Sequence, residues 1–600
     1  MGPLIVSWAC SVTAQKARVE RTGRIALGKV FGERQGQSTG RTFSGNVLQL
    51  RKRAGRPADT FVRPMQIHTL PYSATHRFSP LVLDLLANDP GLREHYTHLP
   101  SLEGLMEAAA SRSFSREARS TLCHVLQQQY NDVPKHAKLQ ANLERLAQAD
   151  CLTITTGHQL CLFGGPLYVP FKILNIIRLA ERSTSERNGK PVVPIFWMAT
   201  EDHDRAEIDH TWFKGKKVVW PGEAEGAVGR MRLIGIERVV EEAVGSLGAG
   251  EHAQAMEELI RECYRPEYTL ARATRLLVNS LFGRFGVICL DGDDPELKRL
   301  FIPAMQEELI NQVGQRSVSY ANEKLQDRYK VQAHAREINL FYLSPQVRSR
   351  IELKDDRFVV LDGGPTFTLD GLLEELNSHP ERFSPNVLLR PVYQETVLPN
   401  VGYVGGGGEL AYWLQLRWLF QGLQVPMPAI LLRTSAAFIS GKHLRQWKEL
   451  GLSLEELFAP VSETASLVAK RTATFDIDMK AEQEQLKALY HGLLERTAII
   501  DPNLQGSIEA RRSSAMHGID RIGKGFLRAA KREQSTALGR IEKIHAAVFP
   551  GGGLQERRDN ILPDLAAFGL NYLDELLQIL DPMANEFTVV EEASADLVEE

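Results

Sequence analysis

Apolar and polar positions alternate most clearly between residues 151 and 204, and the rest of the chain is arranged around this stretch. A β-branched run at 152–156 is followed by an apolar segment at 167–180, whose large side chains recur at helical spacing. A second, almost wholly apolar run follows at 192–199. This order predicts strand, helix and strand. Because a continuously apolar strand needs cover on both faces, the pattern indicates a parallel sheet flanked by helices.

The same criteria predict further parts of this core. Residues 66–149 have a helical period, and 409–420 predict another helix. Two segments of mixed pattern, about 209–283 and 315–383, are expected to be insertions. Further strands are predicted at 286–290, 386–390, 401–404 and 429–432. We therefore expect an α/β core over residues 65–440.

Long helices are predicted after residue 441. Ile519, Ile522 and Phe526 belong to a heptad seam of roughly 40 residues. We expect two antiparallel helices within 441–549, closed by a turn at 550–553, and a C-terminal helical segment at 550–600 that packs on the core. A hairpin buries only one apolar stripe within itself, so the remaining apolar positions predict a homodimer.

Residues 1–64 differ from the rest, with twelve basic and three acidic residues and no sustained period. A transit peptide has such a composition, and so does an upstream extension of the reading frame. We expect disorder in this segment and the start of folded sequence at Met65.

Composition excludes several classes of protein. The chain is 43% hydrophobic and 24% charged, and no run approaches the roughly 18 apolar residues of a membrane span. Its net charge of -3 argues against a nucleic-acid partner. Six scattered cysteines without a C-x-x-C pair favour a reducing compartment, so a cytoplasmic location is expected. Cys151 and Cys161 border the central loop, where a core role is favoured over a reactive one.

Polar clusters stand where the predicted strands end. Glu201, Asp202, His203 and Asp204 follow the run at 192–199, and Thr156, Gly157, His158 and Gln159 follow the run at 152–156. Ligands of parallel sheets bind beyond the carboxyl ends of the strands, so both clusters should share one cleft. The first cluster suits acid–base work or recognition of an amine, a metal site joined by His210, or simple capping of the loop.

A second pair of candidates follows the later strands. Four glycines precede Glu409 at a predicted helix start, which offers backbone N–H groups to an anion. Tyr393, Gln394 and Glu395 follow the run at 386–390 and should reach the same cleft. In the turn after residue 290, Asp293 and Asp294 could bind a cation, although capping of the next helix is favoured.

Four ordered segments resemble the bacillithiol biosynthesis cysteine-adding enzyme (BshC) family: TTGHQLCLFGGPLY, FWMATEDHD, LLRPVYQETVLPNVGYVGGGGELAYW and FPGGGLQERRDN. The resemblance runs from about Met65 to the C-terminus. One departure is His158, where the family's Thr-Gly-Gln-Gln pattern carries Gln. The resemblance implies a Rossmann-like core, insertions comparable to the connecting peptides of class I aminoacyl-tRNA synthetases, and a coiled-coil domain for dimerisation.

The resemblance also implies a reaction, in which the carboxyl group of L-cysteine is joined to the amino group of glucosaminyl malate. No tightly bound cofactor and no metal ligand are expected, and ATP is a candidate for the activating co-substrate. The expected catalytic residues are Glu201, Asp202, His203 and Asp204. The expected substrate-binding residues are Thr156, Gly157, His158, Gln159, Gly164, Gly165, Tyr168, Tyr393, Gln394, Glu395, Gly405, Gly406, Gly407, Gly408, Glu409 and Tyr412.

Two other functions remain open at this point. A metal-dependent hydrolase would use the cluster from Glu201 to Asp204, and stoichiometric metal analysis would identify it. A non-catalytic coiled-coil scaffold would leave the polar strand ends without a purpose.

Overall fold

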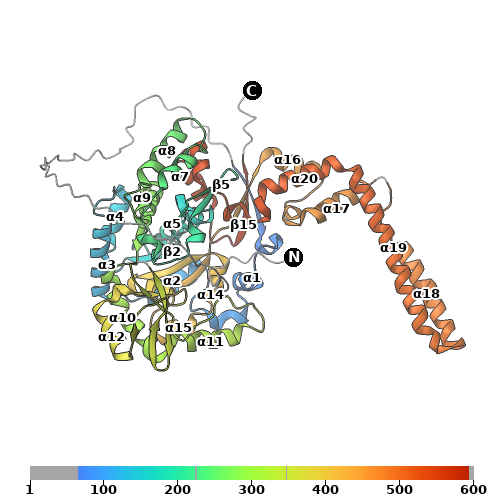
Figure 1. Cartoon of the computed structure of the whole chain (residues 1–600). Coiled ribbons are helices and arrows are strands. Elements are labelled where there is room, and N and C mark those ends of the chain that lie inside the picture. Colours follow the sequence, from blue (N-terminus) through green and yellow to red (C-terminus); the bar gives the residue numbers. More distant parts are fainter. Residues whose placement is uncertain (1–64, 223–225, 346, 474, 593–600) are drawn as a thin grey trace, which may run out of the picture.

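A five-stranded parallel sheet forms the centre of the molecule in a computed structural model, which describes residues 65–222, 226–345, 347–473 and 475–592 (Figure 1). The expectation for residues 1–64 lies outside the described residues. The strand order is β13-β12-β2-β3-β6. Their bounds are β2 Leu152–His158, β3 Val192–Met198, β6 Ile288–Asp291, β12 Asn400–Gly405 and β13 Ala429–Leu432.

Strand β3 shows why the central runs are wholly apolar. Ile195 and Trp197 pack into a core that also contains helices α3 (Arg116–Gln129), α10 (Pro295–Asn311) and α13 (Leu389–Val397). Phe196 and Met198 pack into a second core with α5 (Tyr168–Glu186) and α9 (Leu270–Phe282). Both faces of the sheet are covered, which confirms the predicted parallel architecture.

The chain reverses direction across the sheet at β2. It first adds β3 and β6 on one side of β2, and later adds β12 and β13 on the other. The topological switch point therefore lies between β2 and β12, where ligands of such sheets bind.

The strand predicted at 386–390 is wrong. Asn386 caps a helix instead, because its Oδ1 accepts hydrogen bonds from the backbone N–H groups of Leu388 at 2.9 Å and Leu389 at 3.2 Å. The helix predicted at 409–420 is divided into α14 (Gly407–Trp413) and α15 (Arg417–Gly422).

Two segments separate the core strands. The first follows β3 and contains α6 (Arg205–Ile208), β4 (His210–Phe213), β5 (Lys216–Val219), α7 (Ile236–Val244), α8 (Glu251–Cys263) and α9. The second follows β6 and carries an antiparallel sheet of order β10-β9-β8-β7-β11. Its elements are α10, α11 (Val313–Leu325), β7 (Leu340–Leu343), β8 (Arg348–Lys354), β9 (Arg357–Val360), β10 (Thr366–Phe367), α12 (Leu369–Ser378) and β11 (Phe383–Pro385).

A third sheet joins the two ends of the described chain. Strand β15 (Glu586–Glu592) pairs with β1 (Gln66–Pro71) and with β14 (Ala436–Ser440). The sequence pattern predicts helices over 66–149 and 550–600. These predictions are wrong for β1 and β15, which are strands. The C-terminal helical segment expected at 550–600 contains two short helices, α21 (Leu562–Phe568) and α22 (Tyr572–Ile579), which are separated at Gly569. The N-terminal helices α1 (Pro80–Leu86), α2 (Leu102–Ser111), α3 and α4 (Ala137–Arg145) agree with the sequence pattern.

A helical arm projects from this body (Figure 1). Helices α18 (Lys480–Ile500) and α19 (Gln505–Glu533) form its hairpin. The hairpin turns at Asp501 and Pro502, not at 550–553 as predicted, because Asp501 caps the chain reversal by accepting the Asn503 N–H. Helices α16 (Gly441–Glu449), α17 (Val461–Thr472) and α20 (Ser535–Val548) connect the arm to the body. Within the described residues, no helix has both the length and the apolarity that a membrane span requires.

Candidate active site

The carboxyl ends of β2 and β12 are held together by one buried lysine. Lys172 of α5 is 1% exposed, and its Nζ donates to the Gly157 carbonyl at 2.6 Å and lies 2.8 Å from Glu409 Oε2. Thr156 Oγ1 donates to the Val404 carbonyl at 2.8 Å. The two polar clusters predicted after β2 and β12 therefore meet at the switch point.

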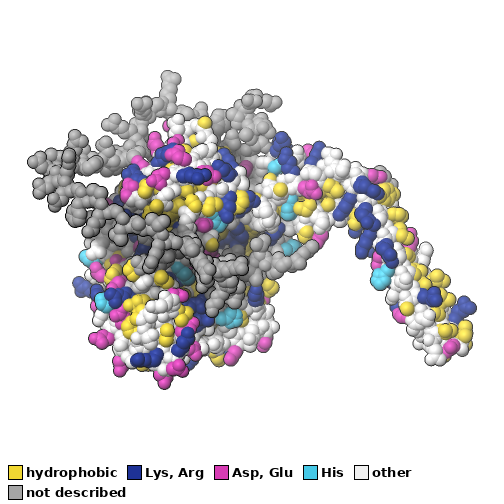
Figure 2. Space-filling view, viewed as in Figure 1, with side chains coloured by type: hydrophobic (Ala, Val, Ile, Leu, Met, Phe, Trp, Pro, Cys, Tyr) yellow, Lys and Arg dark blue, Asp and Glu magenta, His cyan; other side chains and the backbone are white. Residues whose placement is uncertain are grey.

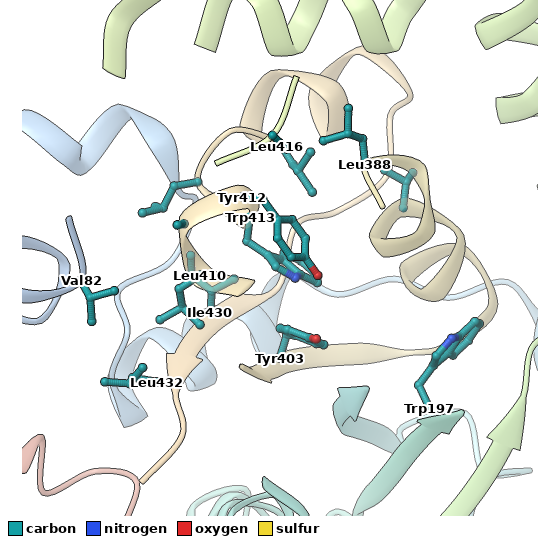
Figure 3. Close-up of a cluster of buried hydrophobic side chains, with 14 of the residues drawn as sticks. Val82, Trp197, Leu388, Tyr403, Leu410, Tyr412, Trp413, Leu416, Ile430 and Leu432 are labelled. Carbon is teal, nitrogen blue, oxygen red and sulfur yellow. The ribbon is translucent and has the colours of Figure 1, made fainter. Parts of the chain in front are cut away.

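The glycine loop is not an open anion site. The Gly406 N–H donates to Glu409 Oε2 at 2.8 Å, so the protein's own carboxylate occupies this end of the short helix α14. Two aromatic residues that flank the loop in sequence, Tyr403 and Trp413, stack on each other with their ring centres 4.4 Å apart (Figure 3). The Gly406 N–H is thus taken by the protein itself, and the expectation that Gly405, Gly406, Gly407 and Gly408 bind a substrate carboxylate stays a prediction that this contact does not support.

A pocket of about 300 Å³ opens beside the end of β2. It lies between the loop after β2, the start of the first inserted segment, and the 3-10 helix η10 (Gln555–Arg557). Its lining residues are Gln159, Cys161, Pro166, Tyr168, Glu207, His210, Thr211, Trp212, Arg557 and Arg558.

Gln159 connects two carboxylates at this pocket. Its Nε2 donates to Asp202 Oδ2 at 2.7 Å, and its side-chain amide also hydrogen-bonds to Glu207. Asp202 Oδ1 accepts the His203 N–H at 2.7 Å. Burial alone would raise the pKa of Asp202, but the hydrogen bonds from His203 and Gln159 and the charge of Arg348 lower it. Asp202 therefore remains a carboxylate at neutral pH.

Glu207 has the opposite electrostatic environment. Burial, together with the nearby Asp204 and Asp202 carboxylates, raises its pKa to about 7, although the Gln159 hydrogen bond partly offsets this. A carboxyl group with such a pKa exchanges its proton near neutral pH, which suits acid–base chemistry.

Two arginines supply positive charge on the other wall. Arg557 is exposed, and the Arg558 guanidinium lies 3.8 Å from the centre of the Trp212 ring. Arg558 Nε is buried and has no hydrogen-bond partner within the described part of the chain. The pocket thus has an anionic wall at Glu207, with Asp202 behind it on the far side of the Gln159 amide, and a cationic wall at Arg557 and Arg558.

Glu201 points away from this pocket into a set of ion pairs. Lys298 Nζ lies 2.7 Å from Glu201 and 2.8 Å from Asp293, and Arg230 lies 2.6 Å from Asp293. Burial raises the pKa of Glu201, and Lys298 counteracts it. Glu201 is therefore held in an ion pair and does not line the pocket, and its catalytic role stays a prediction.

His203 and Asp204 lie on the outer side of the same loop. Arg348 of β8 lies 3.1 Å from His203 Nδ1 and 3.9 Å from the centre of the Phe341 ring, so the inserted sheet packs against this loop. Asp204 precedes α6, and its side chain makes no capping hydrogen bond there. Neither residue lines the pocket.

His158 is an internal contact rather than a ligand contact. Its Nε2 lies 3.0 Å from the Tyr168 hydroxyl and its Nδ1 lies 3.0 Å from the Gln159 carbonyl oxygen. Burial lowers the pKa of the ring to about 4, so His158 is neutral near pH 7. Tyr168 reaches the pocket, while the expectation that His158 touches a phosphate or carboxylate is corrected.

The loop with Gly164 and Gly165 is bound by the chain itself. Asn560 Nδ2 donates to the carbonyl oxygens of Phe163 and Gly165, each at 2.9 Å. Gly165 has a φ of +69°, and a Cβ there would lie 2.6 Å from Cys161 Cβ. Both glycines shape the loop, and their predicted contact with substrate is not supported.

The residues from helix α13 are buried away from the pocket. The Tyr393 hydroxyl donates to the Gly292 carbonyl at 2.6 Å, beyond the end of β6. Glu395 accepts from Gln394 and from Asn400, each at 2.8 Å, and Asn400 begins β12, so this pair lies toward the amino end of that strand. Tyr412 is buried and accepts from Arg390 at 3.3 Å. Neither Gln394 nor Glu395 lines the pocket, although Gln394 also accepts from Arg390 at 3.3 Å.

Metal binding was one of the alternatives for these clusters. Among the described residues, no group of three or more His, Cys, Asp or Glu side chains is arranged to hold a metal ion. Asp294 caps α10, as predicted, by accepting the N–H groups of Glu296 and Leu297.

Cys151 and Cys161 are buried, and burial raises the pKa of each thiol to about 12.

Several site residues were not predicted from the sequence. Lys172 lies inside an apolar helical run, and Lys298 pairs with the distant Glu201 as well as with the nearby Asp293, so neither residue was recognised from the sequence. Arg557 and Arg558 did have one, because they follow a glycine turn within the segment FPGGGLQERRDN. Glu207 lies three residues after Asp204, the last residue of the charged cluster. It lies in helix α6, and the turn into this helix gives its side chain surroundings that differ from those of the cluster.

The fold and the site together define a class of protein. It is a Rossmann-like α/β protein with a coiled-coil arm, and the pocket at the carboxyl edge of its sheet carries both acidic and basic side chains. Residues 65–434 match the family model "Bacillithiol biosynthesis BshC, N-terminal Rossmann-like domain". Residues 436–592 match "Bacillithiol biosynthesis BshC, C-terminal coiled-coil domain". The chain therefore belongs to the bacillithiol biosynthesis BshC family.

Similar curated proteins cover most of both chains. Proteins named "Putative cysteine ligase BshC" are 37% identical in Flavobacterium johnsoniae, covering 88% of this chain and 100% of the relative, and 36% identical in Cytophaga hutchinsonii, covering 85% and 95%. The protein of that name from Christiangramia forsetii is 33% identical, covering 88% and 99%.

Proposed function

We propose that this chain is a ligase that forms an amide bond between the carboxyl group of L-cysteine and the amino group of glucosaminyl malate. The observation that carries the proposal is membership of the BshC family across both domains, together with a polar pocket at the position where such sheets bind ligands. The charges of the pocket suit these substrates, which carry carboxylates and amines.

The basic wall of the pocket binds the carboxylates of the substrates, and the acidic wall binds their amino groups. Arg557 and Arg558 hold the malate carboxylates, since arginine pairs well with carboxylates in two-point contacts. Glu207 faces the amino groups, and Asp202 adds negative charge from behind Gln159. Because a free carboxylate must be activated before it forms an amide, ATP is proposed as the activating co-substrate.

Isothermal titration tests this assignment. Cysteine, glucosaminyl malate and ATP are titrated separately and together into the full chain, and binding of glucosaminyl malate is expected to weaken in Arg557→Met. Failure of the wild-type chain to bind any of the three would contradict the proposal.

We further infer that the protein acts as a homodimer formed through the arm. Apolar side chains gather along it (Figure 2), and several are exposed: Leu489 at 59%, Ile522 at 53%, Phe526 at 40% and Ile500 at 70%. Burial of each such side chain contributes about 1.5–3 kcal/mol. Ile522→Asp combined with Phe526→Asp should therefore yield monomers in light scattering, and a monomeric wild type would refute the inference.

A further inference from the structure

Glu207 is the one pocket carboxyl group whose surroundings prepare it to accept a proton. It lines the pocket, and its own hydrogen-bond partner is the neutral amide of Gln159. Asp202, which the same amide binds, also accepts the His203 N–H and is near the Arg348 guanidinium. Asp202 is thus held as an anion, whereas Glu207 is not.

From this geometry we propose that Glu207 is the general base that takes a proton from the ammonium group of the amino-sugar substrate. The inference rests on the proposed function and adds to it the residue that frees the nucleophile. The step is balanced: the ammonium and the Glu207 carboxylate become a neutral amine and a carboxylic acid, and the acid returns its proton to solvent. The amine lone pair then attacks the activated cysteinyl carbonyl carbon. The C–N bond forms as the bond from that carbon to the ATP-derived activating group breaks, this group leaves with the bonding electron pair, and the nitrogen releases a second proton to solvent.

The groups around Glu207 support this role. Asp202 and Asp204 lie on its own segment and disfavour its charged form. Arg557 and Arg558 from η10, His210 from β4, and Cys161 and Tyr168 from the β2–α5 connection line the same pocket. Asp202 lies behind the Gln159 amide as a nearby negative charge, which would favour an ammonium group at Glu207 without removing its proton. The raised pKa of Glu207, about 7, matches a base that works near neutrality.

The test compares the pH dependence of kcat/KM for wild type, Glu207→Gln and Glu207→Asp. The wild type should lose activity below a pH of about 7, where Glu207 becomes protonated. At pH 7, Glu207→Gln should be about 10²–10⁴-fold slower, as expected for loss of an acid–base group, and the limb set by Glu207 near pH 7 should be lost, which leaves the substrate amine as the source of the pH dependence. Its rate should then rise with pH as solvent deprotonates the amine, and Glu207→Asp should recover part of the activity.

Two measurements separate catalysis from folding and binding. The affinity of Glu207→Gln for glucosaminyl malate, measured by titration calorimetry, should stay within a few-fold of wild type. Glu237→Gln, on the exposed face of α7, is the matched control and should behave as wild type.

Three results would overturn the inference while wild type makes product. These are an unchanged acidic limb in Glu207→Gln, a rate at pH 7 within about threefold of wild type, or a loss confined to substrate affinity. If wild type itself makes no amide, the proposed function fails, and the inference fails with it.

Discussion

The two sides of the loop after β3 place carboxylates in opposite situations. On the β6 side, Glu201 and Asp293 share Lys298, which is 1% exposed, and Asp293 also pairs with Arg230. On the pocket side, Glu207 meets a neutral amide and neighbouring carboxylates. A buried charge is tolerated when it is paired, and an unpaired carboxyl group keeps its proton to higher pH. The difference teaches that the partners of a charged cluster, not its composition, decide which member can react.

The largest expected effect is a loss of unfolding free energy when the ion pairs on the β6 side are broken. Lys298→Met leaves Glu201 and Asp293 buried without their shared cation, and removal of one partner of a buried pair typically costs about 3–5 kcal/mol. Unfolding in urea should show this loss. The control Lys138→Met removes an exposed pair with Glu181, where less than about 1 kcal/mol is expected. Equal losses of unfolding free energy in both variants would show that the ion pairs of Glu201 and Asp293 with Lys298 do not stabilise the fold more than an exposed pair does.

A smaller effect should follow from removing a charge at the pocket. Arg557→Met should raise the KM for glucosaminyl malate about 10–100-fold, because hydrogen bonds to charged groups contribute about 1.5–3 kcal/mol. Its unfolding free energy should stay near that of wild type, in contrast to Lys298→Met. Arg238→Met, at an exposed position of α7, serves as the control. An unchanged KM in Arg557→Met would place the malate carboxylates elsewhere.

The smallest effect is a difference in how Asp202 and Glu207, the two carboxyl groups bound by Gln159, change the stability of the protein with pH. The folded-state pKa of Asp202 is lowered despite its burial, so its contribution is present above its ordinary value of 3.8 and is lost as pH falls through the folded value. The pKa of Glu207 is raised by burial, so its contribution is present below about 4.5 and is lost as pH rises through about 7.

Thermal unfolding from pH 3 to pH 8 measures both slopes. Asp202→Asn should flatten the fall in stability at acid pH, and Glu207→Gln should flatten the fall between about pH 4.5 and 7. Slopes of the same sign for both residues would contradict the electrostatic contrast drawn between them.

Local sequence pattern was sufficient for much of the fold. The core strands β3 and β13 are continuous apolar runs, and β2 and β12 are rich in β-branched residues, so all four carry their own signal. Strands β1 and β15 were missed because each depends on pairing with the opposite end of the described chain. Asn386 redirected a run of apolar residues into a helix, since capping competes with strand formation.

The site was less predictable for the same reason. Both loops after β2 and β3 were found, but the partners that assign their roles come from far away: Lys298 for Glu201, Asn560 for Gly165, and η10 for the cationic wall. The glycine loop had the composition of an anion site, and only the fold shows that Glu409 occupies it. Sequence therefore located the edge of the sheet, and tertiary contacts distinguished its structural residues from those that face the pocket.

The most direct test of the proposed ligase activity is product formation by the purified full chain. L-cysteine, glucosaminyl malate and ATP are incubated with the protein, and the product is measured by mass spectrometry with omission of each component in turn. We predict an amide of the two organic substrates that forms only when all three are present and that falls by about 10²–10⁴-fold in Glu207→Gln at pH 7. Absence of this amide with active, folded wild-type protein would contradict the assignment.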